Sequence, residues 1–152
     1  MAIDLRKRGF ADKVYGVEAE SVNAAAAEKI GLVDKVMDLE SCIRESDLLV
    51  IAVPVGTAAR MLPRILDSFA AEEGCRKVVM DVCSTKENLA KVSRYHKMRS
   101  CYVASHPMAG TEYSGPWAAM PGLFDGRACI ICDSEESSPR AVKTVEDLYA
   151  AL

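Results

Sequence analysis

Short runs of apolar residues alternate along the chain with longer segments in which apolar residues recur at helical spacing. The apolar runs are bounded by turn residues, as is typical of strands buried in a parallel sheet. The segments between them have the amphipathic or alanine-rich composition of helices. The predicted strands are Lys13–Val17, Leu48–Val53, Lys77–Val82, Cys101–Ser105 and Ala128–Cys132, and the predicted helices are Ala2–Arg8, Ser21–Ile30, Thr57–Phe69, Thr85–Tyr95 and Pro139–Leu152.

This order predicts an α/β fold with a doubly wound, mostly parallel sheet. Strands that alternate with helices form parallel sheets covered on both faces, and right-handed crossovers give the double winding. Ligands of such folds bind beyond the carboxyl ends of the strands. Functional residues are therefore expected just after the strands, at positions 18–20, 54–57, 83–86 and 106–115.

Turn and cap residues predict where the helices begin and end. Ser21 is expected to cap the second helix and Gly31 to end it, while Ser84 or Thr85 is expected to cap the helix that follows them. The start of that later helix could also hold an anionic or hydroxyl-bearing ligand. Pro63 falls inside a predicted helix, which it can bend without ending it.

The two ends of the chain depart from the pattern of a complete doubly wound domain. No strand and no glycine-rich turn precede the helix Ala2–Arg8, and no G-x-G-x-x-G motif occurs in the sequence. The last helix continues to Leu152 without a capping residue. We therefore expect residues 1–152 to form one domain that is truncated at its N-terminus, with an exposed sheet edge that favours association.

Composition and charge narrow the classes of function. The formal net charge is −3, which gives no reason to expect a nucleic acid or an anionic membrane as a partner. The apolar run Leu48–Val55 is too short to span a bilayer, and Met1–Phe10 carries charges where a signal peptide has its apolar region. These features predict a soluble, cytoplasmic protein.

The six cysteines have no spacing typical of a disulfide framework, and the chain is long enough to fold without disulfides. Cys129 and Cys132 form a C-x-x-C, but a separation of three positions on a strand places them on opposite faces. This geometry disfavours both a redox pair and a metal site. The cysteines are therefore predicted to be reduced thiols in the core.

A carboxylate and a tight turn are the candidates for binding a cofactor. Glu18 ends the first predicted strand, where a carboxylate can accept hydrogen bonds from both ribose hydroxyls of an adenosine. It would repel a 2′-phosphate, and no arginine follows it closely, so NAD is favoured over NADP. The turn at Ala52, Val53 and Pro54 can lie flat against a dinucleotide. The simpler alternatives are a solvated acid and an ordinary strand–helix turn.

His106 is the candidate for chemistry. It follows a predicted strand, in a loop with two glycines and a proline that could hold a side chain in place. A neutral imidazole can accept a proton near neutral pH, and Glu112 could pair with the imidazole or with a substrate. The alternative is a histidine that only supports the loop. His96 is predicted to be an exposed residue at a helix end, and the chemistry needs no metal ion.

Several segments resemble a known enzyme family. His106-Pro107-Met108-Ala109-Gly110-Thr111-Glu112 is similar to the active-site loop of prephenate and arogenate dehydrogenases, and Asp81-Val82-Cys83-Ser84-Thr85-Lys86 is similar to their Asp-x-x-Ser-x-Lys turn. Ala52-Val53-Pro54 and Ser114-Gly115 match as well. The resemblance covers essentially the whole chain and implies a Rossmann-like fold. It also implies an oxidative decarboxylation in tyrosine biosynthesis, in which prephenate or arogenate gives a hydride to NAD(P), loses carbon dioxide and becomes aromatic.

The resemblance further implies a role for each candidate residue. His106 would take or polarise the proton of the ring hydroxyl, and Ser84 would hydrogen-bond the same hydroxyl and the nicotinamide side. Glu112 would order the polar network at the mouth of the pocket. Glu18 would bind the adenosine ribose, and the turn Ala52–Pro54 would lie beside the cofactor.

The family also has a helical second domain that completes the active site, supplies basic residues for the substrate carboxylates and forms a homodimer. No segment of the chain resembles that domain, so little or no turnover is expected from residues 1–152 alone.

Two other functions stay open at this point. The chain could be the cofactor domain of another β-hydroxyacid-type dehydrogenase, whose catalytic lysine usually lies in the second domain. It could instead be a non-catalytic nucleotide-binding or interaction module that has lost its glycine loop. A thiol-redox domain built on Cys129 and Cys132 is disfavoured by the strand geometry.

Overall fold

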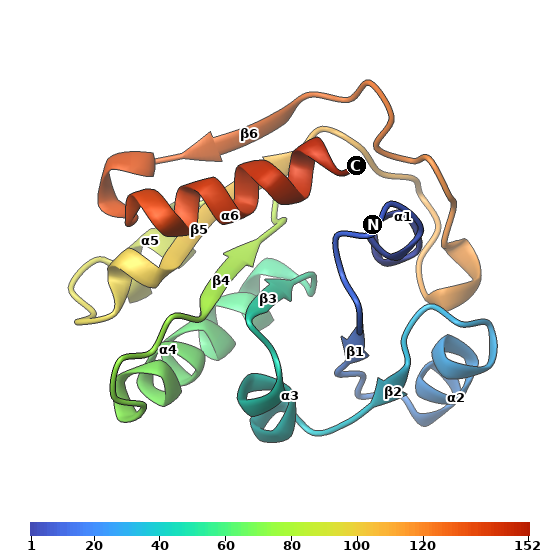
Figure 1. The fold of residues 1–152 in the computed structure, drawn as a ribbon, viewed down its shortest axis with the longest axis horizontal. Helices are drawn as coiled ribbons and strands as arrows, with labels where there is room; N and C mark the ends of the chain where they lie inside the picture. Colours follow the sequence, from blue (N-terminus) through green and yellow to red (C-terminus); the bar gives the residue numbers. More distant parts are fainter. The chain divides into compact units, whose positions relative to one another are not determined.

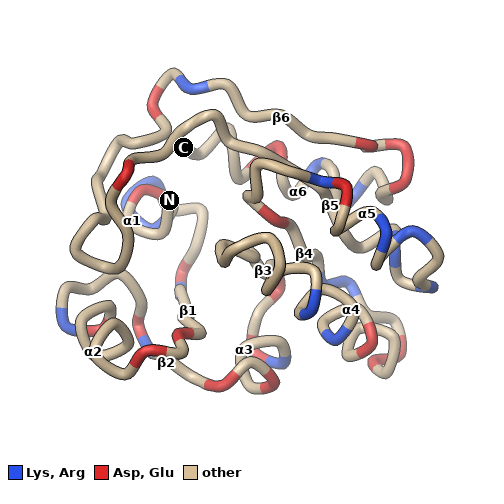
Figure 2. Tube along the Cα trace, turned by 180° about the vertical axis from the view of Figure 1, so that it is seen from behind, with Lys and Arg blue, Asp and Glu red and all other residues tan.

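The computed structural model describes residues 1–152, which divide into two compact units. Unit 1 contains Met1–Ser46, Met108–Ala128 and Leu148–Leu152, and unit 2 contains Asp47–Pro107 and Cys129–Asp147 (Figure 1). Acidic and basic residues are interspersed along both units, without a long stretch of one sign (Figure 2). None of the helices combines the length and apolar character needed to span a bilayer.

Unit 2 is built on a four-stranded sheet in the order β3-β4-β5-β6. Three strands are parallel, namely β3 (Leu48–Ile51), β4 (Val78–Asp81) and β5 (Tyr102–Pro107). The last strand, β6 (Cys129–Cys132), runs antiparallel to β5. The predicted α/β class with a mostly parallel sheet is therefore confirmed.

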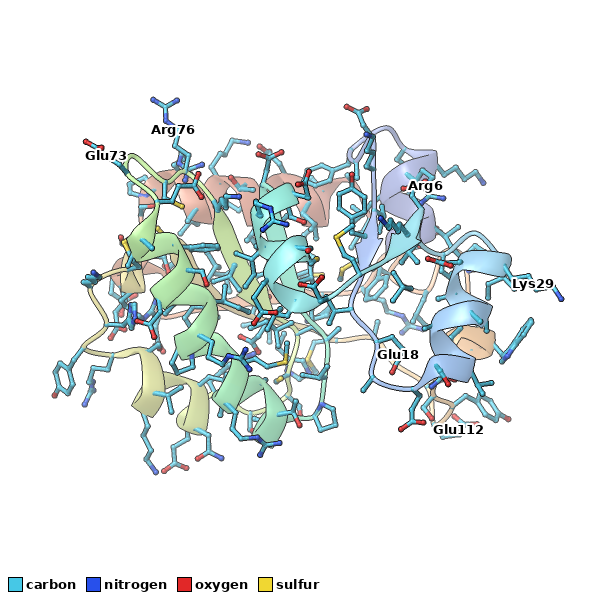
Figure 3. The ribbon with its side chains drawn as sticks, turned by 90° about the horizontal axis from the view of Figure 1, so that it is seen from below. Arg6, Glu18, Lys29, Glu73, Arg76 and Glu112 are labelled. Atoms are coloured by element: carbon cyan, nitrogen blue, oxygen red, sulfur yellow. The ribbon has the colours of Figure 1, made fainter.

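Helices cover both faces of this sheet. The helices α4 (Val55–Ala71) and α5 (Glu87–Ser93) lie on one face, and α6 (Pro139–Ala150) lies on the other (Figures 1 and 3). Helix α4 continues through Pro63, because the rest of its length packs an apolar face against the sheet. Short 3-10 helices span Arg99–Cys101 (η1) and Ser134–Glu136 (η3). The core of unit 2 includes Leu62, Ile65, Leu66, Phe69, Val78, Val79, Met80, Leu89 and Val103.

Unit 1 holds a two-stranded parallel sheet formed by β1 (Tyr15–Gly16) and β2 (Lys35–Val36). Its helices are α1 (Ala2–Lys7), α2 (Ser21–Lys29), α3 (Leu39–Glu45) and the 3-10 helix η2 (Pro116–Ala118). Polar contacts join α1 to distant segments. Arg6 Nη2 lies 2.9 Å from Asp34 Oδ2, and Arg8 Nη2 lies 2.5 Å from Asp125 Oδ1.

The predicted helix ends are partly wrong. Gly31 does end α2, because its positive φ of +72° suits glycine. Ser21, however, is the first helical residue and not the cap, and the preceding Glu20 makes no side-chain capping bond. The cap of α5 is Lys86, so neither Ser84 nor Thr85 caps that helix.

The strands also differ from prediction. β3 is shorter than expected, and Val50 remains 36% exposed because β3 pairs with a neighbour on one side only. β5 extends to Pro107 because β6 pairs with its second half. Ile130 on β6 is 46% exposed, so that strand is not buried as its apolar sequence suggests.

The sequence pattern did not predict β2 and α3. β2 has only two residues, so no alternation of apolar and polar positions can mark it as a strand. The start of α3 has a clear local cause, because Asp38 Oδ1 accepts a hydrogen bond of 2.8 Å from the backbone N–H of Ser41.

All six cysteines are free thiols. Only Cys42 and Cys83 are buried, and the other four are half-buried, so the expectation that all of them lie in the core is wrong. Cys129 and Cys132 sit at the two ends of β6, where strand alternation directs their side chains to opposite faces.

Candidate functional site

The carboxyl ends of β3, β4 and β5 lie at one edge of the unit 2 sheet. The register aligns Ile51, Asp81 and Ala104 across the three strands. The residues that follow them are Ala52–Pro54 after β3, Ser84 after β4 and His106 near the end of β5. The structure therefore brings these predicted site residues to the same edge of one sheet, as the doubly wound pattern requires.

His106 lies inside β5 and not in the loop after it. It pairs with Ile130 of β6, and its side chain is half-buried. The neighbouring Ser105 and Pro107 are both buried, so the backbone around His106 is held firmly. The imidazole forms no hydrogen bond or ion pair with another side chain, which leaves it available to a ligand.

The turns after β3 and β4 present small polar or apolar groups to solvent. Ala52, Pro54 and Ser84 are exposed. The Cys83 thiol donates to the carbonyl oxygen of Val53 at 3.6 Å and so joins the two turns. Burial raises the pKa of the Cys83 thiol, which keeps this donor protonated at neutral pH.

A buried polar network lies directly beneath this edge. Asp81, the last residue of β4, is fully buried, and its carboxylate accepts hydrogen bonds from the Cys83 backbone N–H at 2.9 Å and from the Tyr102 hydroxyl at 2.7 Å. Lys86 Nζ donates to the same carboxylate and forms an ion pair with it. Burial raises the pKa of Tyr102 above its usual range, and the nearby Asp81 carboxylate adds to the rise.

Sequence reasoning noted Asp81 and Lys86 as parts of a turn but gave them no structural role. The available signal was the position of Asp81 at the end of an apolar strand. A charge in a buried strand needs a partner, and Lys86 is the first cation after it.

Glu18 and Glu112 belong to unit 1 and are both exposed. Glu18 follows β1, and its Oε1 accepts a hydrogen bond of 3.0 Å from the backbone N–H of Glu20, which leaves the second oxygen open. The loop that carries Glu112 contacts α2, since a Cβ placed on Gly115 would lie 3.6 Å from Asn23 Oδ1. Figure 3 shows both carboxylates extending from the end of unit 1 at which α2 begins.

His96 is not the exposed residue that the sequence predicted. Its side chain is 15% exposed, and Nε2 lies 3.2 Å from Asp67 Oδ1. Nδ1 accepts a hydrogen bond of 3.1 Å from the backbone N–H of Met98, so Nε2 is the donor to Asp67. These contacts give His96 a structural role. No group of three or more histidine, cysteine, aspartate or glutamate side chains could hold a metal ion.

Comparison with known proteins shows the family of the chain. The family model described as prephenate dehydrogenase, nucleotide-binding domain, matches residues 1–152. A prephenate dehydrogenase of Bacillus subtilis is 28% identical over 150 residues, which cover 97% of this chain and 40% of that protein. The chain therefore spans less than half the length of this relative.

Solved structures share the fold. Prephenate dehydrogenase from Aquifex aeolicus, in complex with hydroxyphenyl propionate and NAD+, superposes with a TM-score of 0.76 at 20% identity, over 99% of this chain and 51% of that one. Arogenate dehydrogenase from Synechocystis superposes with a TM-score of 0.79 at 24% identity, over 99% of this chain and 50% of that one.

Proposed function

Because the chain belongs to the family of prephenate dehydrogenase nucleotide-binding domains, we propose that residues 1–152 form the NAD-binding domain of an enzyme that oxidatively decarboxylates prephenate or arogenate. The observation that carries the proposal is the position of His106 and Ser84. Both residues lie at the edge where the three parallel strands of the unit 2 sheet end, and neither side chain is engaged by another side chain.

The residues at this edge suit a dinucleotide. Ala52 and Pro54 are exposed and small enough to allow close approach of a flat ligand. Gly56, in the first turn of α4, has open space around its Cα, where an added Cβ would meet only the tip of Arg60. In unit 1, the open oxygen of Glu18 can accept a hydrogen bond from an adenosine ribose hydroxyl, and its charge disfavours a 2′-phosphate, so NAD is preferred over NADP.

The chain's own residues then have defined tasks. His106 as a neutral imidazole accepts the proton of the ring hydroxyl, and Ser84 hydrogen-bonds the same hydroxyl to orient it. Glu112 offers an exposed carboxylate in unit 1 to polar groups of a ligand. When bound, NAD+ supplies the hydride acceptor. Loss of carbon dioxide and aromatisation make the reaction strongly favourable in free energy. The protein therefore needs only to align the substrate with the hydride acceptor and to accept one proton.

The remaining parts of the function lie outside residues 1–152 in this proposal. We place the basic residues that bind the substrate carboxylates, and the contacts of a homodimer, in the part of the relatives' length that this chain does not cover. We further propose that the full-length enzyme works in the cytoplasm on a small-molecule substrate.

The test is a His106→Asn substitution in the full-length protein. Asparagine keeps a polar side chain of similar reach but cannot accept the proton, so kcat/KM should fall by about 10²- to 10⁴-fold. The affinity for NAD+, measured by calorimetry, should change less than about twofold, because the cofactor-binding groups remain. His96→Asn is the matched control, because His96 contacts Asp67 away from this edge and its loss should leave kcat/KM unchanged.

Unchanged turnover in His106→Asn would contradict the proposal and favour another β-hydroxyacid-type dehydrogenase. Failure of the full-length protein to bind NAD+ or NADP+ would favour a non-catalytic module.

A further inference from the structure

The segment of β5 that carries His106 extends beyond the residues of β5 that pair with β4. The parallel ladder between β4 and β5 ends at the pair Asp81↔Ala104. On its other side, β5 remains paired with β6 through His106↔Ile130. His106 itself is therefore paired with a strand on one side only.

Side chains also connect the ends of β4 and β5. The Ser105 hydroxyl donates a 2.6 Å hydrogen bond to the main-chain carbonyl of Asp81. Lys86 Nζ donates to the main-chain carbonyl of Ser105, the residue directly before His106. The same ammonium donates to the main-chain carbonyl of Cys83 at 2.7 Å, directly before Ser84. One ammonium thus joins the backbone positions that precede both proposed active-site residues.

The ammonium is itself fixed. Its counter-ion Asp81 is fully buried and is held by the Tyr102 hydroxyl and the Cys83 backbone N–H, while the Lys86 side chain is 16% exposed. A lysine side chain is normally flexible, but three acceptors in a partly buried site restrict it to one position. The exposed pair Lys91–Glu87 in α5 has no comparable contacts, since its side chains are 66% and 78% exposed.

We propose that Lys86, oriented by Asp81, is a positioning residue that sets the placement of His106 and Ser84 relative to each other. It acts through the carbonyl groups of Ser105 and Cys83 and does not touch the substrate. The inference rests on the proposed function, because it presumes that His106 and Ser84 serve the reaction. It adds two residues, Lys86 and Asp81, to the set on which turnover depends.

The test introduces Lys86→Met into the full-length enzyme. Lys91→Met is the control, because it removes the same charge from an exposed ion pair. Lys86→Met should lower kcat by about 10- to 100-fold, because proton transfer depends steeply on geometry. KM and the affinity for NAD+ should change less than about threefold. Lys86→Arg, which keeps a cation, should recover part of the lost kcat. Lys91→Met should match the wild type.

The concentration of folded enzyme, measured by circular dichroism and NAD+ titration, separates positioning from a loss of folded protein. A merely structural role would reduce the amount of folded enzyme and leave kcat per folded molecule unchanged. An unchanged kcat per folded molecule in Lys86→Met would overturn the proposal.

If Lys86→Met does not fold, Asp81→Asn provides a second test of the same role. It removes the charge that fixes the Lys86 ammonium and should lower kcat by about threefold to tenfold, again with KM preserved. Wild-type kcat in Asp81→Asn would then overturn the proposal. The two hypotheses fail separately. An active His106→Asn enzyme contradicts the proposed function, whereas an inactive His106→Asn enzyme beside fully active Lys86 and Asp81 variants contradicts the positioning role alone.

Discussion

The phenol of Tyr102 donates a 2.7 Å hydrogen bond to Oδ2 of Asp81, and both side chains are almost completely shielded from solvent. Tyr102→Phe would leave that carboxylate oxygen without this donor in a buried site. The free energy of unfolding should fall by about 1–3 kcal/mol, measured by urea denaturation. Tyr95→Phe is the control, because Tyr95 is 91% exposed and its hydroxyl can be replaced by water at no cost. Equal stability of the two variants would show that the hydroxyl of Tyr102 is dispensable.

The same contact predicts an alkaline loss of stability. Burial and Asp81 raise the pKa of Tyr102 in the folded state, so the stability it contributes is fully present below the unfolded pKa of about 10. That contribution is lost as the pH rises beyond about 10, because the unfolded chain can then ionise this phenol and the folded chain cannot. Unfolding above that pH should release a phenolate signal in the ultraviolet spectrum, and the signal should be smaller in Tyr102→Phe. A Tyr102 that ionises before unfolding would contradict its burial.

The start of α3 predicts an acid-dependent effect. Hydrogen bonds from Ser41, the backbone N–H first, lower the pKa of Asp38. A lowered carboxyl pKa contributes stability above the unfolded pKa of about 3.9, and this is lost as the pH falls through the folded value. Asp38→Ala should therefore lower the melting temperature near neutral pH, and the difference from wild type should shrink in acid. Asp38→Asn keeps an acceptor for Ser41 but should lack the pH dependence.

Phe69 is completely buried on the face of α4 that packs against the unit 2 sheet. Phe69→Ala should lower the free energy of unfolding by about 3–5 kcal/mol, because it removes apolar contacts and leaves a cavity. Val22→Ala on α2 is the control, since Val22 is 77% exposed and its truncation should change stability by less than about 0.5 kcal/mol. Chemical denaturation followed by circular dichroism measures both. A small effect at Phe69 would mean that α4 repacks around the truncated side chain.

Glu18 supplies a prediction on cofactor choice. Glu18→Gln keeps an acceptor for the Glu20 backbone N–H but removes the charge that disfavours a 2′-phosphate. In the full-length protein the ratio of NAD+ to NADP+ affinity should fall by about tenfold, which corresponds to about 1.4 kcal/mol. Paired calorimetric titrations measure the ratio, with Glu20→Gln as a neighbouring carboxylate control. An unchanged ratio would remove Glu18 from the proposed cofactor site.

Local patterns were sufficient for the elements that bury a regular apolar face. The continuous apolar run of β4 and the periodic apolar positions of α4 predicted both elements, including the passage of α4 through Pro63. The family resemblance, carried by the segments around Ser84 and His106, was confirmed over the whole chain. The two-residue strand β2 lies at the other extreme, because a strand so short has no measurable alternation of apolar and polar residues. The predicted strand Lys13–Val17 is present, but only over Tyr15–Gly16.

The features that the sequence did not predict depend on contacts between distant segments. His106 belongs to a strand only because β6 pairs with the end of β5. The bond from Lys86 to Ser105 exists because β4 and β5 are neighbours in the sheet, and no local pattern around Lys86 contains that information. His96 was expected to be an exposed residue at a helix end, whereas its side chain is 15% exposed and lies 3.2 Å from Asp67 of the distant helix α4.

The backbone N–H of Met108 bonds to the carbonyl oxygen of Ala128 at 2.8 Å, so the chain between them is a loop closed at its base. The entropy cost of such a closure grows only with the logarithm of loop length. A change of length between Gly115 and Ala128 should therefore leave the pairing Pro107↔Cys129 in register. Related sequences can diverge in length in that part of the loop, whereas the segment from Met108 to Gly115, which carries Glu112, should keep its length.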